Sequence, residues 1–167
     1  MRNIILRALE PSDIDTLYLW ENTPEMWQYG VSQAPISRHQ LWEYIRSYSA
    51  NPLSEGQLRL MIASGNEKIG TVDLYDIDSR HGRAFVGIMI APEYRRKGYG
   101  RAALSFLTEY CRDTLSLRLL AATIAETNNA SLNLFEASGF TPEASLPGWI
   151  KETGNRYVAA RIFIKEL

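Results

Sequence analysis

The chain has 167 residues, which is long enough to bury a substantial core, and we expect one domain over residues 1–167. Its hydrophobic content of 46% and charged content of 22% are ordinary for a globular protein, and a net charge of −1 gives no reason to expect nucleic-acid binding. Because no apolar run is long enough to span a bilayer and the first residues lack a signal-peptide core, we expect a cytoplasmic protein without a membrane partner.

Cysteine and histidine usage argues against a disulfide, a metal site and a Ser-His-Asp triad. The single cysteine, Cys111, excludes an internal disulfide, and its place on the apolar stripe of an expected helix predicts a buried thiol. His39 and His81 are isolated in the sequence, so neither metal-ligand spacing nor a Ser-His-Asp arrangement is indicated. We therefore expect no metal.

The first third of the chain predicts a strand followed by helices. Residues 4–9 have strand character, and Pro11-Ser12-Asp13 begins a helix with apolar residues at helical spacing. A short helical turn is expected at 25–27, and the capping-box pattern Ser37-x-x-Gln40 predicts a further helix start.

The remainder predicts a strand meander and then alternating helices and strands. Leu58, Leu60 and Ile62 alternate with other residues, as in a half-buried strand. The further expected elements are strands at 68–76 and 84–90, a helix at 102–111, a strand at 117–124, a helix from Asn128-Asn129 to Gly139, and strands at 140–150 and 157–164. This order predicts a mixed α/β fold.

A basic, glycine-containing stretch at 92–101 lies where an expected strand becomes an expected helix. The backbone N–H groups and dipole of a helix N-terminus attract anions, and glycine lets the backbone approach a phosphate. The stretch favours a diphosphate cradle, although a solvated basic turn has the same composition. Its spacing matches neither a P-loop nor a dinucleotide-binding turn.

Three stretches resemble the GCN5-related N-acetyltransferases, the GNAT family. Arg95-x-x-Gly98-x-Gly100 resembles the family's pyrophosphate loop, and residues 128–140 resemble the motif that lines the pantetheine arm. Residues 6–13, followed by Trp20-Glu21-Asn22, are similar to the N-terminal signature of the branch with ribosomal-protein-alanine and spermidine acetyltransferases. The resemblance covers essentially the whole chain. It implies a mixed, mostly antiparallel seven-stranded sheet, splayed at a central parallel strand pair and covered by helices on both faces.

The resemblance also implies acetyl-CoA as co-substrate. The pantetheine arm would lie between the splayed strands and bond to exposed backbone, and the Met89 amide would polarise the thioester carbonyl. Asn128 would bond the arm, cap its helix, or do both. The expected cofactor-binding residues are Ile88, Met89, Ile90, Arg95, Arg96, Lys97, Gly98, Tyr99, Gly100, Arg101, Asn128 and Ser131.

The usual acid–base positions depart from the family pattern. Phe135 stands where many relatives have a proton-donating tyrosine, and Phe85 stands where spermidine-branch relatives have a glutamate. We predict Ser131 as the substitute donor, although a serine in the first turn of a helix is commonly structural; with Met89 it makes up the expected catalytic set. Carboxylates that could act as a base through water are Asp73, Asp76 and Glu126.

Aromatic and acidic residues concentrate in the expected acceptor region, between the first helices and in the last hairpin. They are Trp20, Trp27, Tyr29 and Trp149, with Glu21 and Glu25. Such a set suits a cationic amine, but the tryptophans would equally plug the core beneath loops.

The resemblance implies direct acetyl transfer, without a covalent enzyme intermediate, to a primary amine that is a small amine, a polyamine or a protein N-terminus. The two phenylalanines leave open a noncatalytic acetyl-CoA-binding sensor or regulatory module, and also transfer to a hydroxyl or of a longer acyl group. Edge strands near the C-terminus would allow a homodimer.

Overall fold

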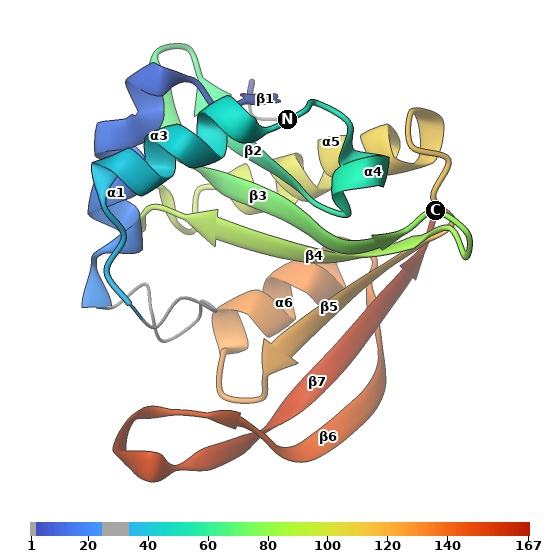
Figure 1. The fold of residues 1–167 in the computed structure, drawn as a ribbon. Coiled ribbons are helices and arrows are strands. Elements are labelled where there is room, and N and C mark those ends of the chain that lie inside the picture. Colours follow the sequence, from blue (N-terminus) through green and yellow to red (C-terminus); the bar gives the residue numbers. More distant parts are fainter. Residues whose placement is uncertain (1–2, 25–33) are drawn as a thin grey trace.

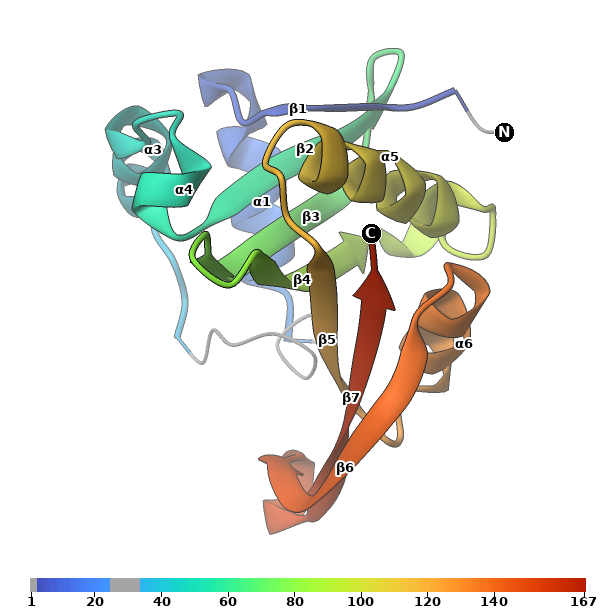
Figure 2. The ribbon, with the colours of Figure 1, turned by 90° about the vertical axis from the view of Figure 1, so that its right-hand side faces the viewer.

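The structure is a computed structural model that describes residues 3–24 and 34–167. Within these ranges, seven strands form one sheet in the order β1-β2-β3-β4-β5-β7-β6 (Figures 1 and 2). Every neighbouring pair is antiparallel except β4 and β5, which are parallel. The strands are β1 (Ile5–Ala8), β2 (Leu58–Ser64), β3 (Glu67–Asp78), β4 (Arg83–Ile90), β5 (Leu119–Ala125), β6 (Thr141–Lys151) and β7 (Tyr157–Glu166).

The helices follow the predicted order, with the one-turn helix α4 (Pro52–Glu55) as an unpredicted addition before β2. They are α1 (Ile14–Glu21), α3 (Arg38–Ser47), α4 (Pro52–Glu55), α5 (Tyr99–Asp113) and α6 (Asn129–Ala137). The predicted capping box is confirmed at α3, where the Gln40 amide donates to Ser37 Oγ at 3.1 Å and the Ser37 amide donates to Gln40 Oε1 at 2.8 Å. The predicted turn at 25–27 lies outside the described residues. Among the described residues, no helix is long and apolar enough to cross a membrane.

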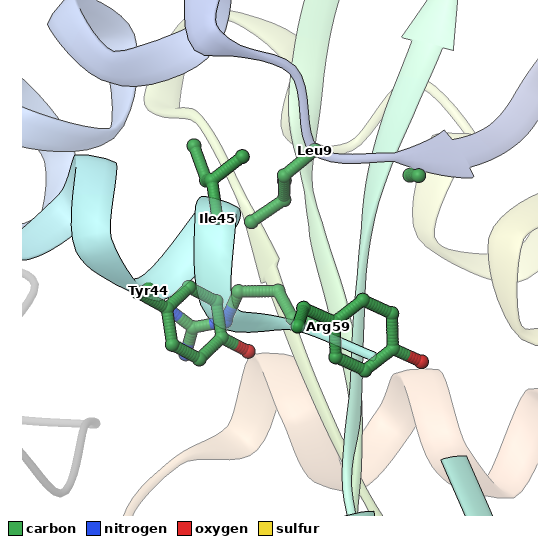
Figure 3. A pocket seen from close by; sticks show the side chains of 6 residues that line it. Leu9, Tyr44, Ile45 and Arg59 are labelled. Carbon is green, nitrogen blue, oxygen red and sulfur yellow. The ribbon is translucent and has the colours of Figure 1, made fainter. Parts of the chain in front are cut away.

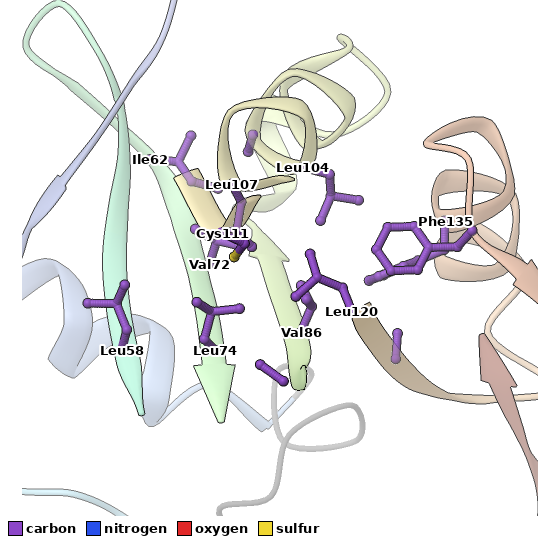
Figure 4. Packing of buried hydrophobic residues seen from close by; sticks show 14 of the residues in the cluster. Leu58, Ile62, Val72, Leu74, Val86, Leu104, Leu107, Cys111, Leu120 and Phe135 are labelled. Atoms are coloured by element: carbon purple, nitrogen blue, oxygen red, sulfur yellow. The ribbon is translucent and has the colours of Figure 1, made fainter. Parts of the chain in front are cut away.

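Helices cover both faces of the sheet, as predicted. One core cluster joins α5 and α6 to the sheet, and Leu104, Leu107, Cys111 and Phe135 pack there against strand residues such as Val86 (Figure 4). A second cluster lies on the opposite face, where α1 and α3 cover β2 and the end of β4. Its buried members are Leu17, Trp20, Leu41, Met61, Ala63 and Ala91.

A buried carboxylate fastens the N-terminal strand to the first helix. Asp13 is 0% exposed and accepts from both terminal nitrogens of Arg7, at 2.7 and 2.9 Å, and from the Glu10 amide at 2.8 Å. Lys68 Nζ of β3 lies 3.2 Å from the same carboxylate. Burial acts to raise the pKa of Asp13, but these partners outweigh it and lower the pKa to about 2. The Leu6–Asp13 signature therefore has a structural function here.

The sheet opens between its two parallel strands. Their pairing runs only from Arg83↔Leu119 to Phe85↔Ala121. Beyond that point β4 continues to Ile90 beside β3, whereas β5 continues beside β7, and the two strands diverge (Figure 2). The predicted splay is thus confirmed, and the C-terminal half of β4 has an open edge.

Candidate active site

The open edge of β4 presents the backbone of alternate residues. The Ala91 amide donates to the Ile69 carbonyl at 2.9 Å, and the Met89 carbonyl occupies the space that a Cβ on Gly70 of β3 would need. Because backbone direction alternates along a strand, the peptide groups of Ile88 and Ile90 face the side that β5 has left. An extended ligand can bond to such an edge as an added strand.

This geometry bears on the predicted role of Met89. The Ala91 amide bonds to β3 and Met89 lies two residues before it, so the alternation along the strand directs the Met89 amide to Thr71 of β3 rather than to the opening. The structure therefore favours Ile88 or Ile90 over Met89 as the source of a carbonyl-polarising amide. The sequence places all three in one strand but does not show which edge each one faces.

The basic loop joins the mouth of this opening to α5. The first intrahelical bond of α5 runs from the Ala102 amide to the Gly98 carbonyl at 3.1 Å, so the amides of Gly100 and Arg101 have no acceptor within the helix. Gly98 has a φ of +84° and Arg96 a φ of +57°, so the chain turns sharply just before the helix. Consecutive amides at such a turn and helix start form a concave anion site.

Side chains of the loop hold it against the sheet. Arg95 Nε donates to the Ile90 carbonyl at 2.9 Å, which ties the loop to the end of β4. Tyr94 packs edge-on against Tyr99 with ring centroids 5.9 Å apart, and Lys97 Nζ lies 5.8 Å from the Tyr94 ring centroid. These contacts shape the loop before any ligand is bound.

Gly100 has a packing function that the sequence did not show. A Cβ at this position would lie 3.0 and 3.3 Å from the two terminal carbons of Leu134 in α6. The absence of a side chain therefore lets α5 lie close to α6. The predicted approach of Gly100 to a phosphate stays a prediction, while Gly98, with open space around it, supplies the glycine-dependent turn.

The start of α6 confirms the capping function of Asn128. Its Oδ1 accepts from the Ser131 amide at 3.2 Å, and the Ser131 side chain is half-buried in the first helical turn. Glu126, one of the candidate bases, accepts from the Ala159 amide of β7 at 3.0 Å and so joins the end of β5 to β7. That contact gives Glu126 a structural function.

The two phenylalanines are held by aromatic neighbours. Phe135 is 3% exposed and lies edge-on to Phe140, with centroids 4.9 Å apart and an interplanar angle of 76°. Phe85 stacks on Tyr75 of β3 with centroids 5.5 Å apart. Neither position has a titratable group, so any acid–base help must come from other residues or from water.

An ion-pair cluster lies beside this aromatic pair. Arg59 of β2 donates through one terminal nitrogen to Glu21 at 2.8 Å and through Nε to Asp73 Oδ1. Burial acts to lower the pKa of Arg59, but the two carboxylates outweigh it and raise the pKa, so the guanidinium stays charged. Sequence reasoning missed Arg59, because the cluster joins a helix to two strands.

The Arg59 side chain also borders a small cavity of about 30 Å³. Figure 3 shows Leu9 and Ile45 above this cavity and Tyr44 and Arg59 below it.

The remaining candidates for the acceptor region differ in exposure. Trp20 is buried at 8% exposure and fills the core, whereas Trp149 of β6 is 67% exposed. Asp76 is exposed, and Trp27, Tyr29 and Glu25 lie outside the described residues.

The open edge of β4 and the basic loop thus lie at one opening in the sheet. A strand whose edge has no partner strand leads to a helix N-terminus that is shaped for an anion. This combination defines a class of transferases that hold an extended, phosphate-bearing donor along a sheet.

The chain belongs to the GNAT acetyltransferase family, because the family model described as "Acetyltransferase (GNAT) domain" matches residues 3–141. It is 26% identical over 156 residues to the uncharacterized N-acetyltransferase YoaA of Bacillus subtilis, covering 92% of this chain and 88% of the relative. It is 27% identical over 144 residues to the spermidine N(1)-acetyltransferase of Vibrio cholerae, covering 86% and 82%.

A solved structure agrees over nearly the whole length. The spermidine N-acetyltransferase from Vibrio cholerae, in complex with CoA and spermine, superposes with a TM-score of 0.87 at 25% identity, covering 98% of this chain and 95% of that one. The chain is therefore an acetyl-CoA-dependent N-acetyltransferase that transfers an acetyl group to an amine.

Proposed function

We propose that the chain acetylates a small primary amine by direct transfer from acetyl-CoA in a ternary complex. The open edge of β4, leading to the anion-shaped start of α5, carries this proposal. It supports a donor bound in an extended form, with its thioester at the inner end of the opening. Relatives named for spermidine acetylation support a cationic amine as the acceptor.

The donor would extend from the loop to the inner end of the splay. Its diphosphate would bind the amides from Arg96 to Arg101, with Arg95 and Lys97 adding positive charge. The pantetheine arm would continue along Ile88 and Ile90 toward Phe85, with Asn128 and Ser131 beside it. Predicted contacts of Tyr99, Gly100 and Met89 belong to the same proposed site.

The chemistry requires three changes of bonding. The lone pair of the neutral amine attacks the thioester carbonyl carbon, the C–S bond breaks, and its electron pair goes to sulfur. The attacking nitrogen gives up a proton to water, and the thiolate receives one. We assign this last proton to a relay through the Ser131 hydroxyl, which takes up a proton from water as it passes its own to sulfur, with an amide of Ile88 or Ile90 polarising the carbonyl.

Turnover of acetyl-CoA with a panel of primary amines tests this function. We expect release of CoA that depends on both substrates and initial-rate patterns of a ternary complex. Acetyl-CoA that binds tightly but is never transferred would instead support a noncatalytic module. Failure of acetyl-CoA to bind would contradict both the enzyme and the noncatalytic module.

Self-association through β6, an edge strand with mostly exposed side chains, stays a prediction that sedimentation can check.

A further inference from the structure

We infer that the position above Gly87 of β4, which the side chain of any other residue would fill, is the seat of the acceptor's amino group, bordered by Asp73, Tyr75 and Phe85. In this assignment Asp73 is an anionic positioning residue, and the Tyr75–Phe85 pair is a wall for the methylene chain of an unbranched primary alkylamine. The inference rests on the proposed function, because it places the acceptor for that reaction.

Gly87 lies where the sheet begins to open. It is the second residue after Phe85, the last β4 residue paired with β5. Side chains alternate along a strand, so position 87 shares a face with Phe85 and not with buried Val86. A group above Gly87 therefore lies next to the inner end of the opening, where the proposed thioester would be.

Neither backbone geometry nor close packing accounts for glycine at this position. Its φ lies outside the left-handed region, and a Cβ built on it would meet only ordinary contacts, the nearest being Asp73 Cβ at 3.7 Å. Gly70 and Gly100 differ, because a Cβ there would collide with Met89 and Leu134. A glycine inside a strand often marks a bulge or a place where a ligand approaches the backbone, and the register shows no bulge at Gly87.

The groups around this space suit an alkylammonium ion. Asp73 Oδ2 and Tyr75 Cε1 each lie 3.9 Å from the Cβ position of Gly87, so a carboxylate oxygen and an aromatic ring edge border the same volume. Tyr75 is 37% exposed and stacks on Phe85, which leaves part of an aromatic surface open to a ligand. Aromatic rings beside an anionic group are well suited to an alkylammonium.

The charge of the neighbouring cluster also favours a cation. Asp73 binds Arg59 through Oδ1, whereas its other oxygen, Oδ2, is the one directed to Gly87. Oδ2 therefore presents carboxylate charge to the position above Gly87, where it would attract an ammonium. Because Asp73 Oδ1 already accepts from Arg59, we assign to Asp73 the binding and orientation of the amine rather than the removal of its proton.

The acetyl transfer requires no reagent besides the alkylammonium, acetyl-CoA and water. The ammonium bound at Asp73 releases one proton to water, and the neutral amine attacks the thioester carbonyl carbon. The C–S bond breaks with its electron pair on sulfur, the nitrogen loses a second proton to water, and the thiolate is protonated. The products are the N-acetylated amine, CoA and one net proton.

Substituting Gly87 tests the seat directly. We expect G87A and G87V to lower kcat/KM for an unbranched alkylamine by about 10- to 200-fold, the range for a methylene-sized misfit in a pocket. In G87A the KM for acetyl-CoA should stay unchanged and the thermal midpoint should not fall, because the one added carbon meets only ordinary contacts. Ala144→Val is the control, because it enlarges an exposed strand residue on β6.

Substituting Asp73 tests the charge. Loss of a hydrogen bond to a charged group is worth about 1.5–3 kcal/mol, so Asp73→Asn should raise the KM for the alkylammonium about 10- to 150-fold. An arylamine, which is uncharged at pH 7, should show less than a twofold change. Equal losses for both amines would overturn the positioning role of Asp73.

Different results would contradict the acetyltransferase function and the position of the amine above Gly87. If the unaltered protein acetylates no amine, the proposed function is wrong. If it acetylates alkylamines and Gly87→Val retains its kcat/KM within twofold, or raises the KM for acetyl-CoA as much as that for the amine, only the seat is wrong.

Discussion

Removing the charge of Asp13 should destabilise the fold without touching the chemistry. In Asp13→Asn, Arg7 and Lys68 lose their shared counterion, and the new amide cannot accept every bond that the carboxylate accepts. Breaking a buried ion pair costs about 3–5 kcal/mol. Because the side chains of Arg7 and Lys68 are 30% and 25% exposed, we expect about 3 kcal/mol.

Acid should reveal the same interaction. The folded pKa of Asp13, about 2, lies below the ordinary value of 3.8, so its ionised form stabilises the fold above about pH 4. This contribution, about 2 kcal/mol from the difference in pKa, is lost as the pH falls through 2. Asp13→Asn should therefore show a flatter decline in stability between pH 4 and 2.

Denaturant unfolding measured at several pH values checks this prediction. Asp15→Asn is the matched control, because Asp15 makes an exposed pair with Arg38 and its side chain is 83% exposed. That control should change the free energy of unfolding by less than about 1 kcal/mol. Equal losses in the two variants, or an unchanged acid profile in Asp13→Asn, would refute the assigned function of Asp13.

Two further substitutions test the donor site. Gly98→Ala places a side chain at a φ of +84°, so it should lower the free energy of unfolding by about 1–2 kcal/mol and weaken acetyl-CoA binding in calorimetry. Gly65→Ala, at a φ of +58° in open space, is the control: it should lose similar stability but bind acetyl-CoA normally. Ser131→Ala should lower kcat by about 100-fold with an unchanged dissociation constant for acetyl-CoA, whereas Ser138→Ala, just after the same helix, should retain kcat. Equal affinities in the glycine pair, or equal kcat values in the serine pair, would contradict these assignments.

Local signals in the sequence predicted most of the fold. The Ser37–Gln40 capping box, the alternating apolar residues of β2 and the glycine-containing start of α5 are each contained within a few residues. The one-turn helix α4 was not predicted, because four residues between the Asn51 cap and Gly56 have no helical periodicity. The strand β5 starts at Leu119 rather than at 117, because the Leu117 amide bonds back to Cys111 and the Arg118 amide to Gly82.

The site was predicted in outline, and its details depend on contacts between distant segments. The spacing of Arg95, Gly98 and Gly100 located the loop, but the packing of Gly100 on Leu134 joins two helices that the sequence keeps apart. The direction of the Met89 backbone depends on its register with β3. The Arg59 cluster likewise requires residues from α1, β2 and β3 to meet.

Residue-resolved amide hydrogen exchange, with and without acetyl-CoA, tests the central claim most directly. The claim is that the donor lies along the open edge of β4 and ends at the start of α5. We predict slower exchange on binding at Ile88 or Ile90 and at Gly100 and Arg101, with little change at Met89, whose amide faces β3. Unchanged exchange along β4 at saturating acetyl-CoA, or protection confined to other strands, would contradict the account.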